Sequence, residues 1–570
     1  MKKHKKYLIF IFFTFGLYFI RLFKGIVSIR PDGFYAGHQN VWSDWALHVT
    51  LTNIFANKPI NEWFLYHPFF SGGKLTYPFL TNLISGLLMK LGLTIDQAMI
   101  WPSILLILLF IFGIYFLNYQ ILNSRKKSLL AMFIFMTSAG PGFINFIKTF
   151  IKNPSLDLAL YPPLDYTRIV EYQWLAGNIP TAMLIPQRAF LIGVTIGVWS
   201  LLTFVLALKT NGKKNQKKQI KLFIISGLLA GILPIAHMHS FIAIVVILGT
   251  ISAIEIIKNS KIKKVNFAER EAVLNNGKAR ESALRQNYNL AFFIFPATIL
   301  SSILFLNFVH GGIERDNFMM IDFGWTSKNN IFSWIEMWWK LWGIMIPISI
   351  YSYYKLIKSK IQFSYFLGFF GLFIISNIII FQPTPWDNSK LFAWVYLGLS
   401  LLAANLIIDI WKKHKLITIL FMIMLSTTGI LELIRLQRFD KNTFMMSSNE
   451  EVNFAREVMS KTKTDSIFLT TSDHNNPIQM WGSRSIVLGY KGWVANFGFD
   501  FEERSKDISD IYQYPEKSQK LINKYKIDYV VVGIRETREF KVNQKYFEEH
   551  YAVAFKNIDT TIFDIKYKIR

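Results

Sequence analysis

Long apolar runs are the feature that most constrains this chain. A run of about 18 or more apolar residues is long enough to cross the hydrocarbon core of a membrane as a helix. The runs stand at 7–26, 100–121, 128–149, 188–208, 222–237, 240–257, 289–309, 337–354, 362–381, 389–409 and 416–434. They predict a polytopic α-helical membrane protein with about eleven transmembrane helices. The hydrophobic share of 52% and the mean hydropathy of +0.30 agree with that class.

Basic residues occur in every second connection between the runs. They precede the first run and follow the second, fourth, sixth, eighth and tenth, for example at Lys126, Lys213, Lys261, Lys358 and Lys412. Because cytoplasmic loops carry an excess of Lys and Arg, this pattern predicts a cytoplasmic N-terminus and an extracytoplasmic C-terminus. No small-residue cleavage site follows the first run, so we expect it to remain as a transmembrane helix rather than a removed signal peptide. The net charge of +26 is mostly a topology signal, and we expect no nucleic-acid partner.

The connections on the predicted outer side differ in length from the basic ones. Three are long, at 27–99, 150–187 and 310–336, and long loops of this kind usually carry function. The polar segment 265–287 on the other side is typical of a solvated helix. The chain contains no cysteine, which excludes disulfides and thiolate metal sites.

The composition changes after about residue 434, where charges of both signs mix. Short β-type runs at 466–471, 485–490, 528–533 and 561–565 alternate with helical patterns such as 447–460 and 516–526. Alternating strands and helices predict a small α/β domain. We therefore expect a transmembrane domain at 1–434 and an extracytoplasmic α/β domain at 435–570.

The first outer loop contains the segment Trp42-Ser43-Asp44-Trp45-Ala46-Leu47-His48. Asp44 and His48 are four residues apart, so a helix would place them on one face. One interpretation makes Asp44 a general base that His48 orients; in the other, Asp44 caps a helix that begins near Trp45. Further along the loop, Lys74 follows two glycines and precedes Tyr77. Lys74 is either an anion contact or a surface residue of a turn.

The second outer loop supplies Arg168 and Glu171, and Arg188 opens the fourth apolar run. Glu171 is a second candidate carboxylate. Arg188 either extends toward the membrane surface or holds a phosphate with its planar guanidinium.

Two further polar groups interrupt the apolar runs. His237 and His239 stand in the segment Ala236-His-Met-His-Ser240. They either bind a metal ion or a phosphate, or form hydrogen bonds within a turn and have no ligand. Asp387 and Asn388 precede Lys390 at the start of the tenth run. Either Asp387 or Asn388 caps a helix there, or Asp387 pairs with Lys390, or these residues belong to a functional site. The predicted topology puts all of these groups on one membrane face, as expected for a site that binds a lipid-linked substrate.

This architecture resembles the GT-C superfamily of membrane glycosyltransferases, which have many spans, an essential acid soon after the first span, and often a C-terminal extracytoplasmic domain. The matching acid here is Asp44, and the stretch from Lys74 to Gly92 is similar to the continuation of that family's first loop. The segments Trp481–Arg484, Gly489–Gly492 and Asp528–Gly533 are similar to the distal domains of some members.

The resemblance implies transfer of a sugar, a hexose or a pentose, from a polyprenyl-phosphate donor on the extracytoplasmic face. Asp44 would deprotonate the acceptor hydroxyl, and the direct displacement would invert the sugar. Arg188, His237, His239 and Lys390 would neutralise the phosphate that leaves. The acceptor would be a glycan, lipid or protein in the cell envelope. A divalent metal is not required, because Asp44 has no acidic neighbour within two residues, although Glu171 is a candidate for a distant second ligand.

Two other classes remain open from the sequence. A transporter or flippase of a lipid-linked or anionic solute would favour charged or broken spans near the midplane and an internal repeat. The ionisable residues stand instead at the ends of the runs, and no repeat is visible, which favours the enzyme. A non-catalytic membrane scaffold with an outer binding domain is the third interpretation.

Overall fold

The computed structural model describes residues 2–38, 41, 44–174, 177–210, 212–262, 270–311, 314, 316, 318–328, 330–357 and 363–568. The chain forms two compact units. Unit 1 comprises Met1–Phe23, Ser103–Asn307 and Met319–Arg438. Unit 2 comprises Lys24–Pro102, Phe308–Phe318 and Phe439–Arg570. Unit 2 thus contains both the long first loop and the C-terminal residues. The sequence analysis had assigned these two segments to different domains.

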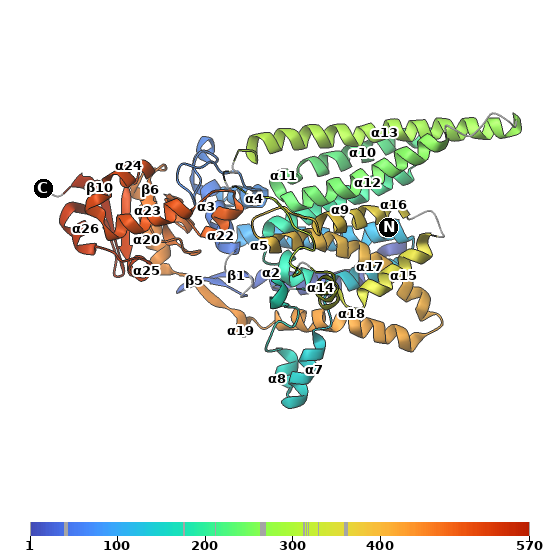
Figure 1. Ribbon diagram of the computed structural model, residues 1–570, viewed down its shortest axis with the longest axis horizontal. Coiled ribbons are helices and arrows are strands. Elements are labelled where there is room, and N and C mark those ends of the chain that lie inside the picture. Colours follow the sequence, from blue (N-terminus) through green and yellow to red (C-terminus); the bar gives the residue numbers. More distant parts are fainter. Residues whose placement is uncertain are drawn as a thin grey trace. The chain divides into compact units, whose positions relative to one another are not determined.

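Helices dominate unit 1 (Figure 1), and many of them are apolar. Eight apolar stretches in the described residues are long enough to cross a membrane: Lys5–Lys24, Ile95–Leu122, Arg188–Lys209, Gln216–Ala236, Met238–Asn259, Arg285–Phe308, Pro385–Trp411 and Lys415–Arg435. They correspond to helices α1 (Lys5–Ile11) with α2 (Leu17–Lys24), α5 (Ile95–Leu122), α9 (Arg188–Lys209), α10 (Gln216–Gly231) with α11 (Leu233–Ala236), α12 (Met238–Ile262), α13 (Arg270–Phe308), α17 (Ser389–Trp411) and α18 (Lys415–Arg435). A polytopic membrane protein is therefore the class that this unit defines.

The remaining three predicted spans differ from expectation. The run 128–149 is two helices, α6 (Arg125–Met136) and α7 (Phe143–Lys152), because a segment containing Pro141 separates them. The run 337–354 is likewise divided into α14 (Ile331–Trp342) and α15 (Met345–Ile357) at Gly343, which has φ +50°. The third, α16 (Phe363–Ser376), is shorter than the run 362–381. In contrast, the polar segment that ends at residue 287 continues without a break into the next span as α13, although residues 263–269 lie outside the description.

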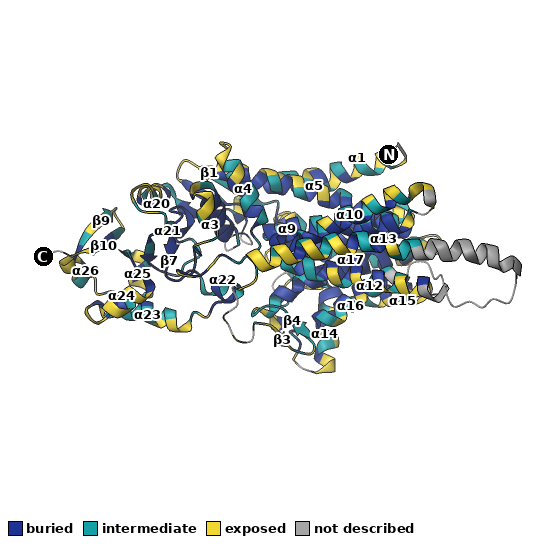
Figure 2. Ribbon diagram, turned by 90° about the horizontal axis from the view of Figure 1, so that it is seen from above, coloured by how far each residue is buried: buried dark blue, intermediate teal, exposed yellow. Residues whose placement is uncertain are grey.

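Small residues let the central helices of unit 1 approach one another. A Cβ at Gly193 of α9 would lie 2.3 Å from the Cβ of His237, and one at Gly197 would lie 2.6 Å from the ring of Trp394 in α17. Close backbone contact through glycine is a common way to pack helices in membranes. Figure 2 shows α9 and α17 as mostly buried, so the starts of α9, α12 and α17 are held together in the interior of the unit.

Several lysines lie at the C-terminal ends of α9 and α17. Lys127 Nζ in α6 lies 2.6 Å from Asn405 Oδ1 and 3.2 Å from Asp409 Oδ2 near the end of α17. Lys209 at the end of α9 donates to Asn123 Oδ1 at 3.1 Å. This grouping of lysines agrees with the alternation read from the sequence, and the orientation of the termini stays a prediction.

A mixed sheet organises the C-terminal part of unit 2. Its strand order is β7–β6–β8–β10–β9, with β6 parallel to both β7 and β8 and with β10 antiparallel to β8 and β9. The strands are β6 (Ile467–Leu469), β7 (Ser485–Ile486), β8 (Tyr529–Gly533), β9 (Tyr551–Lys556) and β10 (Thr560–Lys568). The helices are α20 (Asn449–Lys461), α21 (Pro477–Met480), α22 (Lys491–Asn496), α23 (Glu502–Gln513), α24 (Gln519–Tyr525), α25 (Ile534–Glu539) and α26 (Gln544–His550). The predicted α/β pattern of strands and helices is therefore confirmed.

The first loop joins these C-terminal residues through a second sheet. Strands β1 (Val27–Arg30), β2 (Gly33–Ala36) and β5 (Phe444–Ser448) form an antiparallel sheet in the order β1–β2–β5. Arg504 in α23 adds a further link, since its guanidinium donates to the carbonyls of Ser71 and Val487, both at 2.9 Å. The loop is thus an integral part of unit 2.

Arg484 provides a test of how unit 2 is stabilised. This buried guanidinium donates to the carbonyls of Met459 at 2.5 Å and Thr462 at 2.8 Å, at the end of α20, where a cation also suits the helix dipole. We expect Arg484→Met to destabilise the protein by about 2–3 kcal/mol, because hydrogen bonds from a charged donor are lost. Thermal unfolding of the purified chain checks this expectation. Lys520→Met, at an exposed position of α24, should leave the unfolding temperature unchanged.

Candidate active site

A buried arginine begins the central helix of unit 1. Arg188 is the first residue of α9, directly after Pro186-Gln187, and is 1% exposed. Proline before the helix start fixes the direction in which the chain enters it. Five residues later, Gly193 lies against His237, and the ring of Phe190 contacts the His237 ring at a centroid distance of 5.3 Å. The start of α9 therefore borders the two histidines.

His237 and His239 lie where one apolar stretch ends and the next begins. His237 has extended backbone angles and terminates α11, and His239 is in the first turn of α12. The backbone N–H of Ser240 donates to His237 Nδ1 at 3.1 Å, which makes this nitrogen the acceptor and leaves the ring proton of a neutral imidazole on Nε2. The His239 ring lies 5.6 Å from that of His237, and its buried Nε2 has no hydrogen-bond partner among the described residues.

The start of α17 adds an ion pair to this group. Lys390 Nζ lies 2.7 Å from Asp387 Oδ1, and the lysine is close enough to interact electrostatically with both imidazoles. The second carboxylate oxygen, Asp387 Oδ2, is buried and has no hydrogen-bond partner in the part of the chain that is described. Asn388 does not cap α17 with its side chain, contrary to one expectation; it binds instead the carbonyls of Ser376 and Ile379.

We call Arg188, His237, His239, Asp387 and Lys390 the basic cluster. The contacts above link the last four, and Arg188 begins helix α9, whose Phe190 and Gly193 pack on His237. All five are buried or nearly buried at the starts of α9, α12 and α17. A permanent cation, an ammonium and two imidazoles suit an anion with several acceptor oxygens. Placing such polar groups at the end of apolar helices is costly unless they are paired or used. The cluster is therefore chemically suited to hold a phosphate.

The candidates of the second outer loop make contacts of their own. Arg168 lies 3.6 Å from Asp165, whose Oδ1 also accepts from the backbone and hydroxyl of Thr167. Glu171 forms an ion pair with Lys340 of α14, which also lies 2.6 Å from Glu336. The side chains of Arg168 and Glu171 are exposed, whereas that of Asp165 is buried, and no contact among the described residues links Glu171 to the basic cluster. Its role as a second carboxylate stays a prediction.

Asp44 and His48 belong to unit 2. Asp44 is the first residue of α3 (Asp44–Asn57), and Trp42 and Ser43 lie outside the described residues. The helix is buried along most of its length, from Trp45 to Phe55. His48 Nδ1 lies 2.8 Å from Asn82 Oδ1 of α4 (Leu80–Lys90). Asn82 was not identified from the sequence, since an isolated asparagine in an apolar helix carries no signal of its own.

Lys74 and Tyr77 lie in the same loop. Gly72, with φ +83°, turns the chain, and Gly73 N–H donates to the carbonyl of Phe70 at 3.0 Å. Lys74 follows as an exposed side chain, which is the geometry of a surface turn. The ring of Tyr77 packs edge-on against Phe497 at 5.0 Å. Whether either residue contacts a substrate stays a prediction.

Among the described residues, no three His, Asp or Glu side chains are grouped in a way that would hold a metal ion. Whether the reaction uses a divalent metal stays a prediction from the sequence.

Comparison with solved structures identifies the fold. The chain is similar to the oligosaccharyltransferase of Archaeoglobus fulgidus tethered to an acceptor peptide, with a TM-score of 0.54 and 13% identity over 97% of this chain and 73% of that one. The structure of the same enzyme, AglB, with an inhibitory peptide and a dolichol-phosphate gives a TM-score of 0.52 and 12% identity over 96% and 73%. ArnT from Cupriavidus metallidurans, bound to undecaprenyl phosphate, gives 0.45 and 9% over 97% of each chain.

The fold is therefore similar to that of an archaeal oligosaccharyltransferase, which agrees with the architecture that the resemblance in the sequence implied. The similarity to the archaeal oligosaccharyltransferase extends over 97% of this chain and 73% of that enzyme. No protein-family model and no curated protein matches the sequence.

Proposed function

We propose that this protein is a membrane glycosyltransferase that moves a sugar from a polyprenyl-phosphate donor to a hydroxyl-bearing acceptor. The observation that carries the proposal is the basic cluster, a buried group of basic side chains at the ends of apolar helices. A lipid-linked phosphate combines the two properties that this setting suits, an anionic head and an apolar chain. The fold supports the proposal, since the archaeal enzyme of similar fold was solved with a dolichol-phosphate.

The proposed reaction is a single displacement. The acceptor oxygen forms a bond to the anomeric carbon while the bond from that carbon to the phosphate oxygen breaks, which inverts the sugar. Asp44 takes the proton of the acceptor hydroxyl, and the phosphate leaves with the electron pair of the broken bond. Arg188, Lys390 and the histidines of the basic cluster stabilise the negative charge of the departing phosphate. The proposed reaction takes place on the extracytoplasmic side, with the N-terminus in the cytoplasm, as the basic connections of the sequence predict.

The proposal is tested by donor turnover with the full chain in lipid nanodiscs. Polyprenyl phosphates that carry a radiolabelled hexose or pentose are supplied together with soluble glycan and hydroxyl-containing peptide acceptors. We expect release of free polyprenyl phosphate and appearance of label in an acceptor. A second assay follows the lipid-linked sugar in vesicles that contain the full chain. Movement of the intact lipid-linked sugar across the vesicle membrane, with no bond broken in the vesicle assay or the nanodisc assay, would show a transporter and would refute the proposal.

His239 gives a prediction for donor binding. We expect His239→Gln to raise the KM for the donor by about tenfold or more, because one hydrogen bond to a charged phosphate is weakened. Steady-state kinetics at varied donor concentration measures the change. The matched control is His414→Gln, at the exposed residue that precedes α18. Equal KM values for His239→Gln and the unchanged chain would remove His239 from the donor site.

A further inference from the structure

The C-terminal residues of unit 2 enclose a cavity of about 1000 Å³. Its walls come from the segments that follow β6 and β8, together with the end of β5, the start of α20 and the start of α22. Strands β6 and β8 are parallel, with Phe468 opposite Tyr529, so their carboxyl ends meet at one edge of the sheet. The cavity lies at that edge.

The strand order makes this edge a favoured position for a ligand. After β6 the chain continues to β7 on one side of β6, whereas after β8 it continues to β9 and β10 on the far side of β8. The two connections leave in opposite directions and open a crevice between the strand ends. In open α/β sheets, ligands bind in the crevice at such a switch point. Topology and cavity therefore indicate the same site.

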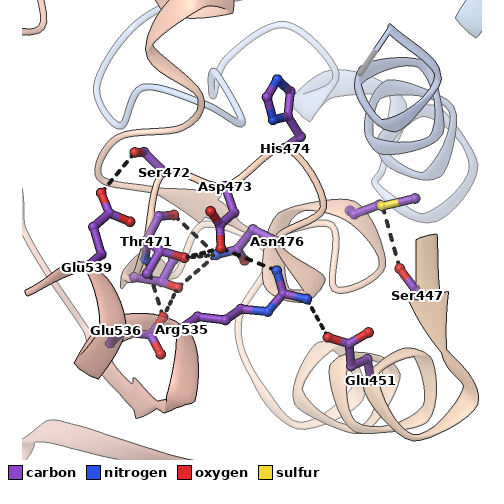
Figure 3. A network of polar contacts seen from close by, with 12 residues as sticks. Ser447, Glu451, Thr471, Ser472, Asp473, His474, Asn476, Arg535, Glu536 and Glu539 are labelled. Carbon is purple, nitrogen blue, oxygen red and sulfur yellow. Dashed lines mark hydrogen bonds and ion pairs between the residues drawn. The ribbon is translucent and has the colours of Figure 1, made fainter. Parts of the chain in front are cut away.

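Polar side chains at the cavity are already held in place (Figure 3). Glu536, 2% exposed, accepts from Thr470 Oγ1 at 2.7 Å and from the backbone of Thr471 at 3.3 Å. Glu539 accepts from Ser472 Oγ at 3.2 Å. Figure 3 also shows Arg535 between two acids; its guanidinium nitrogens lie 2.5 Å from Glu451 Oε1 and 3.3 Å from Asp473 Oδ2. Groups fixed in this way lose little conformational freedom when a ligand binds.

The charge and shape of the lining indicate the class of ligand. Six carboxylates line the cavity (Glu450, Glu451, Asp473, Glu536, Glu539 and Asp559) against three permanent cations (Lys491, Arg535 and Arg538), so an anion is disfavoured. Burial raises the pKa of Glu536 and of Glu539, which also disfavours additional negative charge. Tyr490 lies against His474 with ring centroids 3.5 Å apart and offers an aromatic surface to the cavity. Acceptors, donors and an aromatic face together suit a neutral molecule rich in hydroxyl groups.

We propose that this cavity is a binding site for a neutral saccharide of a few sugar units. The sugar hydroxyls donate to the carboxylates and accept from Lys491, and one sugar face packs on Tyr490. The volume is at the upper end of the range for small-molecule sites, about 300–1,000 Å³, and accommodates more than one sugar ring. Saccharide binding here does not require the transfer reaction proposed above.

Calorimetric titration of the full chain in lipid nanodiscs tests the proposal, since nanodiscs avoid detergents with sugar headgroups. The probes are maltotriose, mannotriose and chitotriose, with inorganic phosphate as the anionic comparison. We expect any phosphate binding, which the basic cluster suits, to be the same in Tyr490→Ala and Glu539→Gln as in the unchanged chain. We expect at least one trisaccharide to bind with a Kd below about 1 mM. Tyr490→Ala and Glu539→Gln should each weaken binding by about tenfold or more, equivalent to about 1.4 kcal/mol.

Matched controls separate the cavity from the rest of the domain. Tyr567→Ala and Glu549→Gln replace the same residue types at exposed positions of β10 and α26, and they should leave the Kd unchanged. The proposal is overturned if no trisaccharide binds, if Tyr490→Ala and Glu539→Gln abolish phosphate binding, or if these two variants bind the trisaccharide as tightly as their controls. Because donor turnover is measured separately, failure of this inference is distinguishable from failure of the proposed function.

Discussion

Replacing Asp44 with asparagine is expected to reduce the kcat of sugar transfer by about 10²–10⁴-fold, the usual contribution of a general base. The substitution removes the group that accepts the hydroxyl proton but preserves size and polarity. Asparagine is also as good as aspartate at a helix start, so α3 should form normally. The KM for the donor should change little, because the proposed donor contacts belong to the basic cluster.

The control for Asp44→Asn is another aspartate in the first turn of a helix in the same unit. Asp96 is in the first turn of α5, is partly exposed and interacts with the hydroxyl of Thr94. Asp96→Asn should retain full activity and the same unfolding temperature. Full activity of Asp44→Asn would refute its role as base. Loss of activity accompanied by a lower unfolding temperature would assign Asp44 to the stability of α3 instead.

Much of the fold follows from local sequence patterns. The apolar runs predict the long helices because burial of the backbone in hydrocarbon demands helix over the whole span. The strands of the C-terminal residues are visible in the same way, as short β-branched runs such as Val530–Val532. The breaks between α6 and α7 and between α14 and α15 were missed because the flanking residues remain apolar, and only Pro141 and Gly343 signal them.

Pairings between distant segments could not be predicted. Strand β2, near the N-terminus, pairs with β5, which opens the C-terminal part, and neither sequence specifies its partner. The pairing of Glu171 with Lys340 and the contact of His48 with Asn82 depend on loop conformations in the same way. By contrast, the ion pair of Asp387 and Lys390 was foreseeable, because residues three apart at a helix start are neighbours.

The second large effect concerns Lys390. We expect Lys390→Met to lower kcat/KM for the donor by about 10²–10³-fold, because an ammonium is lost from the charges that stabilise the departing phosphate. The single variant also leaves the Asp387 carboxylate buried without its cation, since the Asp387 side chain is 7% exposed. An unpaired buried charge destabilises a protein strongly. Loss of activity in this variant alone would therefore have two explanations.

The double variant Asp387→Asn/Lys390→Met separates them, because it removes the stranded charge together with the lysine. If Lys390 serves only to pair with Asp387, the double variant should regain both stability and activity. If Lys390 binds the donor phosphate, the double variant should unfold at nearly the original temperature and remain about 10²–10³-fold less active. Lys412→Met, just after the other end of α17, controls for the loss of a lysine and should be fully active. Recovery of activity in the double variant would refute the phosphate role, and the basic cluster would then depend on Arg188 and the histidines.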